Sequence, residues 1–393
     1  MKRGIGTRAV HSGEKVDART AAVTQAIHQS STFAFPSIEE MARVFKGQSS
    51  AYIYTRYGNP TSRSVEEKLA ELEGCEDGLL FSSGMAAMSS VLLTFCRPGA
   101  HLVVARDVYG GTFQLAAELM RDHLGLDVRF VDAGEPSQLE ESLKGKPALI
   151  SVESPTNPLL KIIDLEAIAR AAHDAGCLLL VDNTFATPVN QNPARFGADI
   201  VLHSASKYLA GHSDLIAGAV AGPSGHIDRI RKTLRLLGGC IDPHAAWLLG
   251  RSMKTLPLRV YRQNESALAI ARFLKGHPKV ANVYYPGLPD HPNHDLAARQ
   301  MRGFGGVLSF ELHGGVAALE SLTKRLELTV LAPSLGGVDS LMLPPAVSSH
   351  IALPVEVRRL SGISDGLMRL AVGVEDTEDL LSDFDQALEA VEL

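Results

Sequence analysis

Residues 199–208 combine side chains that are able to do chemistry together. The apolar run 200–202 leads directly to Ser204, Ser206 and Lys207. Such a run is typical of a buried strand, whose carboxyl end would bring the three polar side chains to one place. Hydroxyl and backbone N–H groups bind phosphate, and a desolvated lysine amine forms a Schiff base with an aldehyde. The alternative is a strand end with a solvated lysine, since lysine is seldom buried without a partner.

Four further apolar runs end in residues that suit the same site. The turn with Gly84 and Met85 follows the run 79–81, Tyr109 follows 101–105, Asn157 follows 148–152, and Asp182 follows 178–181. The turn opens a helix, whose N–H groups would suit a phosphate. An aromatic ring would stack on a flat ligand, and a carboxylate would pair with a protonated pyridine nitrogen.

Each of these residues also has a structural explanation. Glycine is common in strand–helix turns, Tyr109 would also serve as packing, and Asn157 would also initiate a turn. Asp182 would also suit a helix N-cap. Together, however, the strand ends supply a phosphate cradle, a stacking ring, a carboxylate and an aldehyde-trapping lysine. One cofactor needs all four, and we therefore predict pyridoxal 5'-phosphate.

Other cofactor motifs are missing from the sequence. It contains no GxGxxG after a strand, no GxxxxGK[ST], no HExxH and no GxSxG. The 14 histidines do not show metal-ligand spacing within a convincing helix. We therefore predict no metal site.

The elements that position these residues alternate between strand and helix. Short apolar runs at 78–81, 101–105, 128–131, 148–152, 178–181 and 200–202 are interleaved with helical stretches such as 165–175. This rhythm predicts an α/β fold with a mostly parallel central sheet and helices on both faces. After residue 253 a long helical pattern (258–275), a strand pattern (306–312) and a closing helix (377–391) indicate a smaller C-terminal α+β domain.

Three regions follow from these patterns. Residues 1–57 are predicted to form an N-terminal arm with a short helix at 37–45. Arms of this kind rarely fold alone and usually lie on another subunit or domain. Residues 58–256 would form the large cofactor-binding domain, with a first helix over 64–73 that Gly74 ends, and residues 257–393 the C-terminal domain.

Composition limits the class of protein. The chain has 393 residues, of which 45% are hydrophobic and 21% charged, with a net charge of −6. This balance argues against nucleic acid or an anionic membrane as a partner. The four cysteines are scattered, the first 20 residues lack a signal-peptide pattern, and no apolar run has the length of a membrane span. We predict a cytoplasmic protein with reduced thiols.

Several motifs resemble those of a known family. They lie at 54–61, 83–85, 153–158, 181–185, 203–214, 334–337 and 369–376. Over nearly its whole length the chain resembles the pyridoxal-phosphate-dependent enzymes of Cys/Met metabolism, which include cystathionine γ-synthase, cystathionine γ-lyase, methionine γ-lyase and the homoserine-ester sulfhydrylases. The resemblance implies an aspartate-aminotransferase-like (type I) fold, amino-acid substrates, and a homotetramer built from two catalytic dimers.

The resemblance also implies roles for individual residues. Lys207 would bond to the cofactor and, with Tyr109 and Tyr54, carry out catalysis. Tyr109 would stack on the cofactor ring, and Asp182 would pair with the ring nitrogen. The phosphate would be held by Gly84, Met85, Ser204 and Ser206, and by Tyr54 and Arg56 of a neighbouring subunit. Arg369, with Asn157 and Ser334, would bind the substrate carboxylate.

The exact activity is left open among related reactions. Segments 237–243 and 331–337 resemble plant-type cystathionine γ-synthases, and γ-replacement or γ-elimination on homoserine esters or cystathionine is therefore predicted, with the γ-synthase first and the γ-lyase second. Gly111 stands where methionine γ-lyases have a cysteine. Ile53 and Gln114 stand where many synthases and lyases have charged side chains, which leaves methionine γ-lyase or sulfhydrylase activity open. Together with Pro333, these two residues would decide which substrate the far end of the pocket accepts. A non-catalytic pyridoxal-phosphate binding protein is the alternative of another class; it would not need Arg369.

Overall fold

The computed structural model describes residues 3–348, 351, 355–360 and 362–391. Within them the larger of two sheets has seven strands in the order β1-β7-β6-β5-β4-β2-β3. The strands are β1 (Asp77–Phe81), β2 (His101–Ala105), β3 (Asp127–Val131), β4 (Leu149–Glu153), β5 (Leu178–Asp182), β6 (Ile200–His203) and β7 (Gly218–Gly222). β7 pairs antiparallel with β1 and β6, and the other pairs are parallel. All strands except β7 therefore end at the same edge, and the predicted mostly parallel α/β sheet is confirmed.

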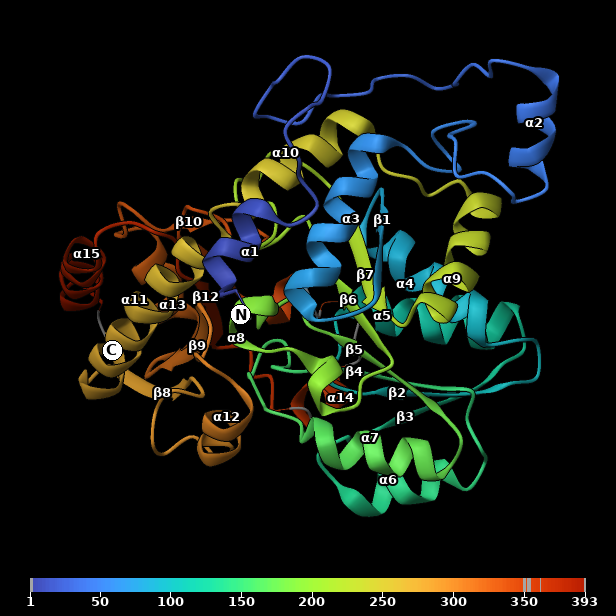
Figure 1. Ribbon diagram of the computed structural model, residues 1–393. Coiled ribbons are helices and arrows are strands. Elements are labelled where there is room, and N and C mark those ends of the chain that lie inside the picture. The colour runs from blue at the N-terminus through green and yellow to red at the C-terminus, as the bar shows by residue number, and fades with distance from the viewer. Residues whose placement is uncertain (1–2, 349–350, 352–354, 361, 392–393) are drawn as a thin grey trace.

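Helices cover both faces of this sheet. They are α3 (Pro60–Glu73), α4 (Gly84–Phe95), α5 (Gly110–Gln114), the π-helix η1 (Leu115–His123), α6 (Pro136–Leu143), α7 (Leu165–Asp174), α8 (Thr187–Asn190), the 3-10 helix η2 (Pro193–Phe196), α9 (Ser224–Leu237) and α10 (Pro243–Met253). Leu80 of β1 belongs to one core with α3, and its neighbour Phe81 belongs to another with α4 and α9. Figure 1 shows α3 and α10 at the top of the view and α6 and α7 together at the bottom.

Helix α3 begins four residues before its predicted start. The side chain of Asn59 accepts a hydrogen bond from the backbone N–H of Thr61, and Pro60 occupies the first turn. Both features favour a helix start, because an N-cap acceptor satisfies a free N–H and proline needs no donor there. Gly74 ends the helix, as predicted, with a left-handed φ of 75°.

A second sheet follows in the C-terminal part. Its order is β10-β11-β12-β9-β8, and β10 and β11 form its one parallel pair in the described residues. The strands are β8 (Val280–Tyr284), β9 (Val307–Leu312), β10 (Val330–Leu331), β11 (Leu341–Leu343) and β12 (Leu367–Ala371). The helices are α11 (Leu256–Gly276), α12 (His294–Gln300), α13 (Gly315–Thr323), the 3-10 helix η3 (Pro345–Val347), α14 (Val355–Leu360) and α15 (Thr377–Glu389). This α+β arrangement begins close to the predicted residue 257; the domain boundary itself stays a prediction.

The N-terminal segment is only partly attached to the rest of its own chain. Helix α1 (Ile5–His11) packs against α3, where Lys68 donates a hydrogen bond to the carbonyl oxygen of Ala9 (2.7 Å). Helix α2 (Ile38–Phe45) lies near the predicted 37–45 and is capped by Ser37. Figure 1 shows the chain running across the top of the molecule to α2, which stands apart from the sheet.

Candidate active site

A cavity of about 920 Å³ opens at the carboxyl edge of the larger sheet. The predicted residues that line it are Gly84, Met85, Tyr109, Asn157, Asp182, Ser204, Ser206, Lys207, Ser334 and Arg369. They come from the ends of β1, β2, β4, β5 and β6 and from the second sheet. The strand ends therefore meet in space, as their positions in the sequence predicted.

Lys207 projects into this cavity from the turn after β6. Its Nζ donates a hydrogen bond to Oγ of Ser334 (2.9 Å). Burial, and the positive charge of Arg369, lower the pKa of the Lys207 ammonium. An amine that loses its proton more easily than usual is a better nucleophile and base. Ser334 has a φ of 148°, a strained value for a residue with a side chain, as is common at functional sites.

Arg369 lies on β12 and is 5% exposed. Its Nη1 donates to Oδ1 of Asn157 (3.1 Å) and its Nη2 to the carbonyl oxygen of Ser334 (2.8 Å). Burial lowers the pKa of the guanidinium to about 10. Both acceptors are neutral oxygens, so the cation has no ion-pair partner among the described residues. A carboxylate entering the cavity would supply one.

Two carboxyl groups lie side by side at the ends of β4 and β5. Glu153 pairs with Asp182 in the strand register. Oδ1 of Asp182 accepts hydrogen bonds from the backbone N–H (3.0 Å) and the hydroxyl (2.5 Å) of Thr184. Burial raises the pKa of both acids, and that of Glu153 is raised further by the charge of Asp182.

Glu153 is a site residue that the sequence reasoning missed. Its Oε2 accepts a hydrogen bond from the backbone N–H of Tyr109 (2.9 Å), and its Oε1 has no partner among the described residues. It was part of the motif at 153–158, but no role was assigned to it. A glutamate that ends an otherwise apolar buried strand was the available signal, because a charge there is costly without a partner.

The start of α4 and the turn after β6 approach each other closely. The hydroxyl of Ser83 accepts from the backbone N–H of Ala86 (3.0 Å), and the first N–H groups of α4 have no partner within the helix. A Cβ atom on Gly84 would lie 3.0 Å from Cβ of Ser204, so the missing side chain permits this approach. The hydroxyl of Ser206 accepts a hydrogen bond from the backbone N–H of Ala217 (2.9 Å), the residue before β7.

These features fit pyridoxal phosphate. Free helix N–H groups and serine hydroxyls form an anion site at one end of the cavity. Oδ2 of Asp182, which accepts no hydrogen bond among the described residues, supplies an acceptor at the other end. Lys207 lies in the same cavity with an amine of lowered pKa.

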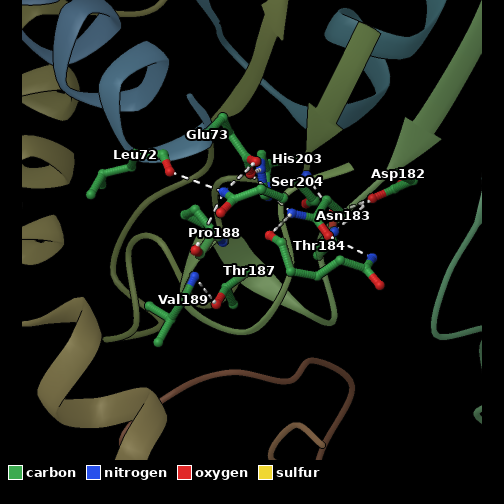
Figure 2. A network of polar contacts seen from close by, with 12 residues as sticks. Leu72, Glu73, Asp182, Asn183, Thr184, Thr187, Pro188, Val189, His203 and Ser204 are labelled. Carbon is green, nitrogen blue, oxygen red and sulfur yellow. Dashed lines mark hydrogen bonds and ion pairs between the residues drawn. The ribbon is translucent and has the colours of Figure 1, made fainter. Parts of the chain in front are cut away.

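A buried polar network lies behind these strand ends (Figure 2). Glu73 of α3 joins His203, which precedes Ser204, and Asn183, which follows Asp182. Figure 2 shows Glu73 next to His203, with Asn183 and Thr184 toward Asp182. The sequence reasoning did not identify this network.

The structure places Tyr54 and Arg56 away from the cavity of their own chain. Nη1 of Arg56 donates to the carbonyl oxygen of Arg235 (2.7 Å), and its guanidinium stacks on Tyr57 and Tyr54 at 5.1 and 5.9 Å from the ring centroids. Gly111, Gln114 and Pro333 do line the cavity. Their predicted influence on the substrate therefore has a structural basis.

The described part of the chain shows neither a candidate metal cluster nor a candidate membrane-spanning helix. No group of three or more His, Cys, Asp and Glu side chains there is arranged to hold a metal ion. No helix there is both long and apolar enough to span a membrane.

Known proteins are similar to this chain in sequence and in fold. Residues 6–389 match the family model described as "Cys/Met metabolism PLP-dependent enzyme". The chain is 42% identical over 389 residues to cystathionine γ-synthase 1, chloroplastic, of Arabidopsis thaliana, a match that covers 98% of this chain and 69% of that protein. It is 42% identical to L-methionine γ-lyase of Fusobacterium nucleatum, over 99% of both chains. The crystal structure of cystathionine γ-synthase from Xanthomonas oryzae pv. oryzae, in complex with aminoacrylate and cysteine, matches with a TM-score of 0.95 at 42% identity, over 99% of both chains.

Similarity identifies the family but not the member. Other relatives, at 41 to 44% identity, are named cystathionine γ-lyase and cystathionine β-lyase. The match over nearly the whole chain confirms the resemblance that the motifs predicted, together with the cofactor. The chain therefore belongs to the pyridoxal-phosphate-dependent transsulfuration enzymes of Cys/Met metabolism, and it has their aspartate-aminotransferase-like type I fold.

Proposed function

We propose that this enzyme catalyses γ-replacement on an activated homoserine with cysteine, the reaction of a cystathionine γ-synthase. The observation that carries the proposal is that Ser334 links the Lys207 amine to the Arg369 guanidinium: Nζ bonds the Ser334 hydroxyl, and Arg369 bonds the Ser334 carbonyl oxygen. A guanidinium binds an amino-acid carboxylate in two-point fashion, and it would hold the substrate with its α-carbon near the amine.

Each residue then has a defined task. Gly84, Met85, Ser204 and Ser206 would hold the cofactor phosphate, Asp182 the ring nitrogen and Tyr109 the ring face. Pyridoxal phosphate held by these residues would supply an electron sink that acidifies the α-proton of the substrate. The Lys207 amine, when free, would take that proton at Nζ, for which its lowered pKa suits it.

The arm would complete a second subunit's site. Tyr54 and Arg56 lie outside the cavity of their own chain, on a segment whose apolar side chains Ile38 and Phe45 are 81% and 67% exposed. We propose that these two residues reach the phosphate site of a neighbouring subunit within a homotetramer of two catalytic dimers. The four cysteines are unpaired, which supports the proposed cytoplasmic location.

The substrate end of the cavity favours the synthase over a methionine γ-lyase. A Cβ atom on Gly111 would lie 2.6 Å from Cε1 of Tyr109, so a cysteine there would require the ring to move. Gln114, in place of an arginine of many synthases and γ-lyases, removes a charged contact for a distal amino acid and keeps methionine γ-lyase and sulfhydrylase activity as alternatives. Cystathionine γ-lyase stays the second candidate.

The test offers the purified holoenzyme O-acyl- or O-phosphohomoserine with and without cysteine. We expect cystathionine as the main product with cysteine, with little 2-oxobutanoate. Faster release of 2-oxobutanoate and cysteine from cystathionine itself would move the assignment to the γ-lyase. Release of pyruvate from cystathionine, with no γ-replacement, would overturn the proposal.

A further inference from the structure

The buried network around Glu73 is not used by the mechanism proposed above (Figure 2). Glu73 is the last residue of α3 and is fully buried. Its Oε1 accepts hydrogen bonds from Nε2 of His203 (2.6 Å) and from Nδ2 of Asn183 (2.9 Å), and its Oε2 accepts one from Nδ2 of Asn192 (3.2 Å). A buried carboxylate is stable only when donors or cations compensate it. Three donors on one side chain provide this compensation for Glu73.

His203 connects this carboxylate to the cofactor site. A carboxylate accepts hydrogen bonds and does not donate them, so Nε2 of His203, which faces Oε1 of Glu73, is the nitrogen that donates. Glu73 and His203 form an ion pair when the imidazole is protonated. His203 ends β6, the neighbour of the strand that ends in Asp182. Burial raises the pKa of Asp182, whereas the hydrogen bonds from Thr184 and the positive charge of a protonated His203 lower it. On the other side of Asp182 lies Glu153, an acid, which cannot give this support.

We propose that Glu73 is a positioning residue for the cofactor: it holds His203 as an imidazolium, and that cation keeps Asp182 ionised for the ring nitrogen of pyridoxal phosphate. The inference rests on the role proposed above for Asp182. Glu73 itself lies behind the strand ends and is not among the residues that line the cavity. Its effect on the charge of Asp182 would pass through His203.

A purely structural role makes a different prediction. The network also joins Asn183 to the carbonyl oxygen of Gln191 (3.1 Å), and Gln191 to the carbonyl oxygen of Ser154 (2.9 Å). It therefore ties the segments after β4 and β5 together. If Glu73 served only this purpose, its replacement would disturb the whole site, and binding of any ligand of the same shape would weaken equally.

The test compares two ligands on the full-length protein after removal of its cofactor. One is pyridoxal phosphate, and the other is its carbocyclic analogue, in which C–H replaces the ring nitrogen while the aldehyde and phosphate are retained. We expect Glu73→Gln to weaken pyridoxal phosphate about tenfold, the equivalent of one pKa unit, and the analogue by less than about twofold. Equal losses for both ligands, or no loss for either, would overturn the proposal.

A matched control lies on the same helix. Glu66 is buried as well, but it accepts hydrogen bonds from Arg231 (3.5 Å) and from the backbone N–H of Leu80 (3.3 Å), away from the network. Glu66→Gln should leave the ratio of the two affinities unchanged. If Glu73→Gln does not fold, the double variant Glu73→Gln/His203→Gln, whose amides bond to each other without charge, should show the same selective loss.

Asp182→Asn separates this inference from the one on which it rests. The variant should lose affinity for pyridoxal phosphate and not for the analogue. A failure of Asp182→Asn to discriminate would refute the proposed role of Asp182. If Asp182→Asn discriminates and Glu73→Gln does not, only the role of Glu73 is refuted.

Discussion

Four buried or partly buried ionisable groups determine the chemistry of the cavity at the scale of single residues. Glu153 and Asp182 end neighbouring strands, while Lys207 and Arg369 approach them from the turn after β6 and from the second sheet. Burial disfavours the charged form of each group. The site is therefore costly for the folded protein until cofactor and substrate supply opposite charges.

Glu153→Gln should stabilise the holoenzyme, by about 2 kcal/mol near neutral pH. Burial and Asp182 raise the pKa of Glu153 well above 4.5. Because the folded state keeps a proton that the unfolded chain loses, wild-type stability falls as the pH rises from 4.5 through the raised pKa. Glutamine keeps an acceptor for the backbone N–H of Tyr109 and removes this loss. The melting temperature of Glu153→Gln should therefore exceed that of the wild type by an amount that grows as the pH rises. A difference in melting temperature that does not depend on pH would contradict the assignment.

Arg369→Lys should raise KM for the amino-acid substrate about 30- to 160-fold, with a smaller effect on kcat. Lysine cannot bond Asn157 and a carboxylate together in one plane, and losing one such charged contact costs about 2 to 3 kcal/mol. Steady-state kinetics measures both constants. Arg229→Lys is the control, since Arg229 stacks on Phe95 (4.5 Å) outside the cavity and should leave KM unchanged. A fall in kcat at constant KM would argue against carboxylate binding.

At the scale of elements, local pattern predicted the strands that bear the site. The run 178–181 is continuously apolar and Asp182 follows at once, which is the pattern of a buried parallel strand that ends at a ligand site. Strand β7 was missed, because Gly218–Gly222 contains two glycines and two alanines and has little strand propensity of its own. It exists because β1 and β6 both pair with it.

The missed site residues share a different physical cause. A glutamate at a helix end, such as Glu73, is normally solvated, and only the fold brings it to His203, which is 130 residues away in sequence. Glu153 likewise meets Tyr109 across 44 residues. Contacts of this kind depend on strand order and helix packing, which the sequence pattern does not specify.

Gly218→Ala tests how β7 supports the start of α4. A Cβ atom there would lie 2.0 Å from the carbonyl oxygen of Ser83, the residue that caps α4. The chain must shift, so we expect a loss of about 1 to 3 kcal/mol in unfolding free energy and weaker cofactor binding. Gly225→Ala is the control, because no atom lies within 4 Å of its added Cβ and α9 favours alanine. The unfolding free energy from urea titration and the affinity for the cofactor should both fall for Gly218→Ala and should not fall for Gly225→Ala. Equal losses in the two variants would contradict this account.

At the scale of the whole molecule, the proposed site residues fall into two groups, one in the cavity and one on the N-terminal arm. Lys207 lies in the cavity of its own chain, while Tyr54 and Arg56 lie on the arm outside it. If the arm completes a neighbouring site, each active site needs parts from two chains. The proposed catalytic dimer is then a requirement for activity.

Mixing two inactive variants should restore activity. In a dimer of Lys207→Ala with Arg56→Ala, one site receives the intact lysine from one chain and the intact arm from the other. Random reassociation of equal amounts should therefore regain about a quarter of wild-type activity. The measurement is the rate of cystathionine formation after the two variants are dissociated and reassembled together. Each variant reassembled alone is the control, and a mixture as inactive as both controls would place the arm elsewhere.

The most direct test of the account asks which lysine carries the cofactor. Borohydride reduction of the holoenzyme fixes the cofactor to the amine that holds it, and mass spectrometry of a digest then locates the pyridoxyl group. We predict that it lies on Lys207, the lysine that follows β6 and bonds Ser334. Labelling of another lysine, or an unlabelled Lys207 in protein that retains cofactor, would contradict the account.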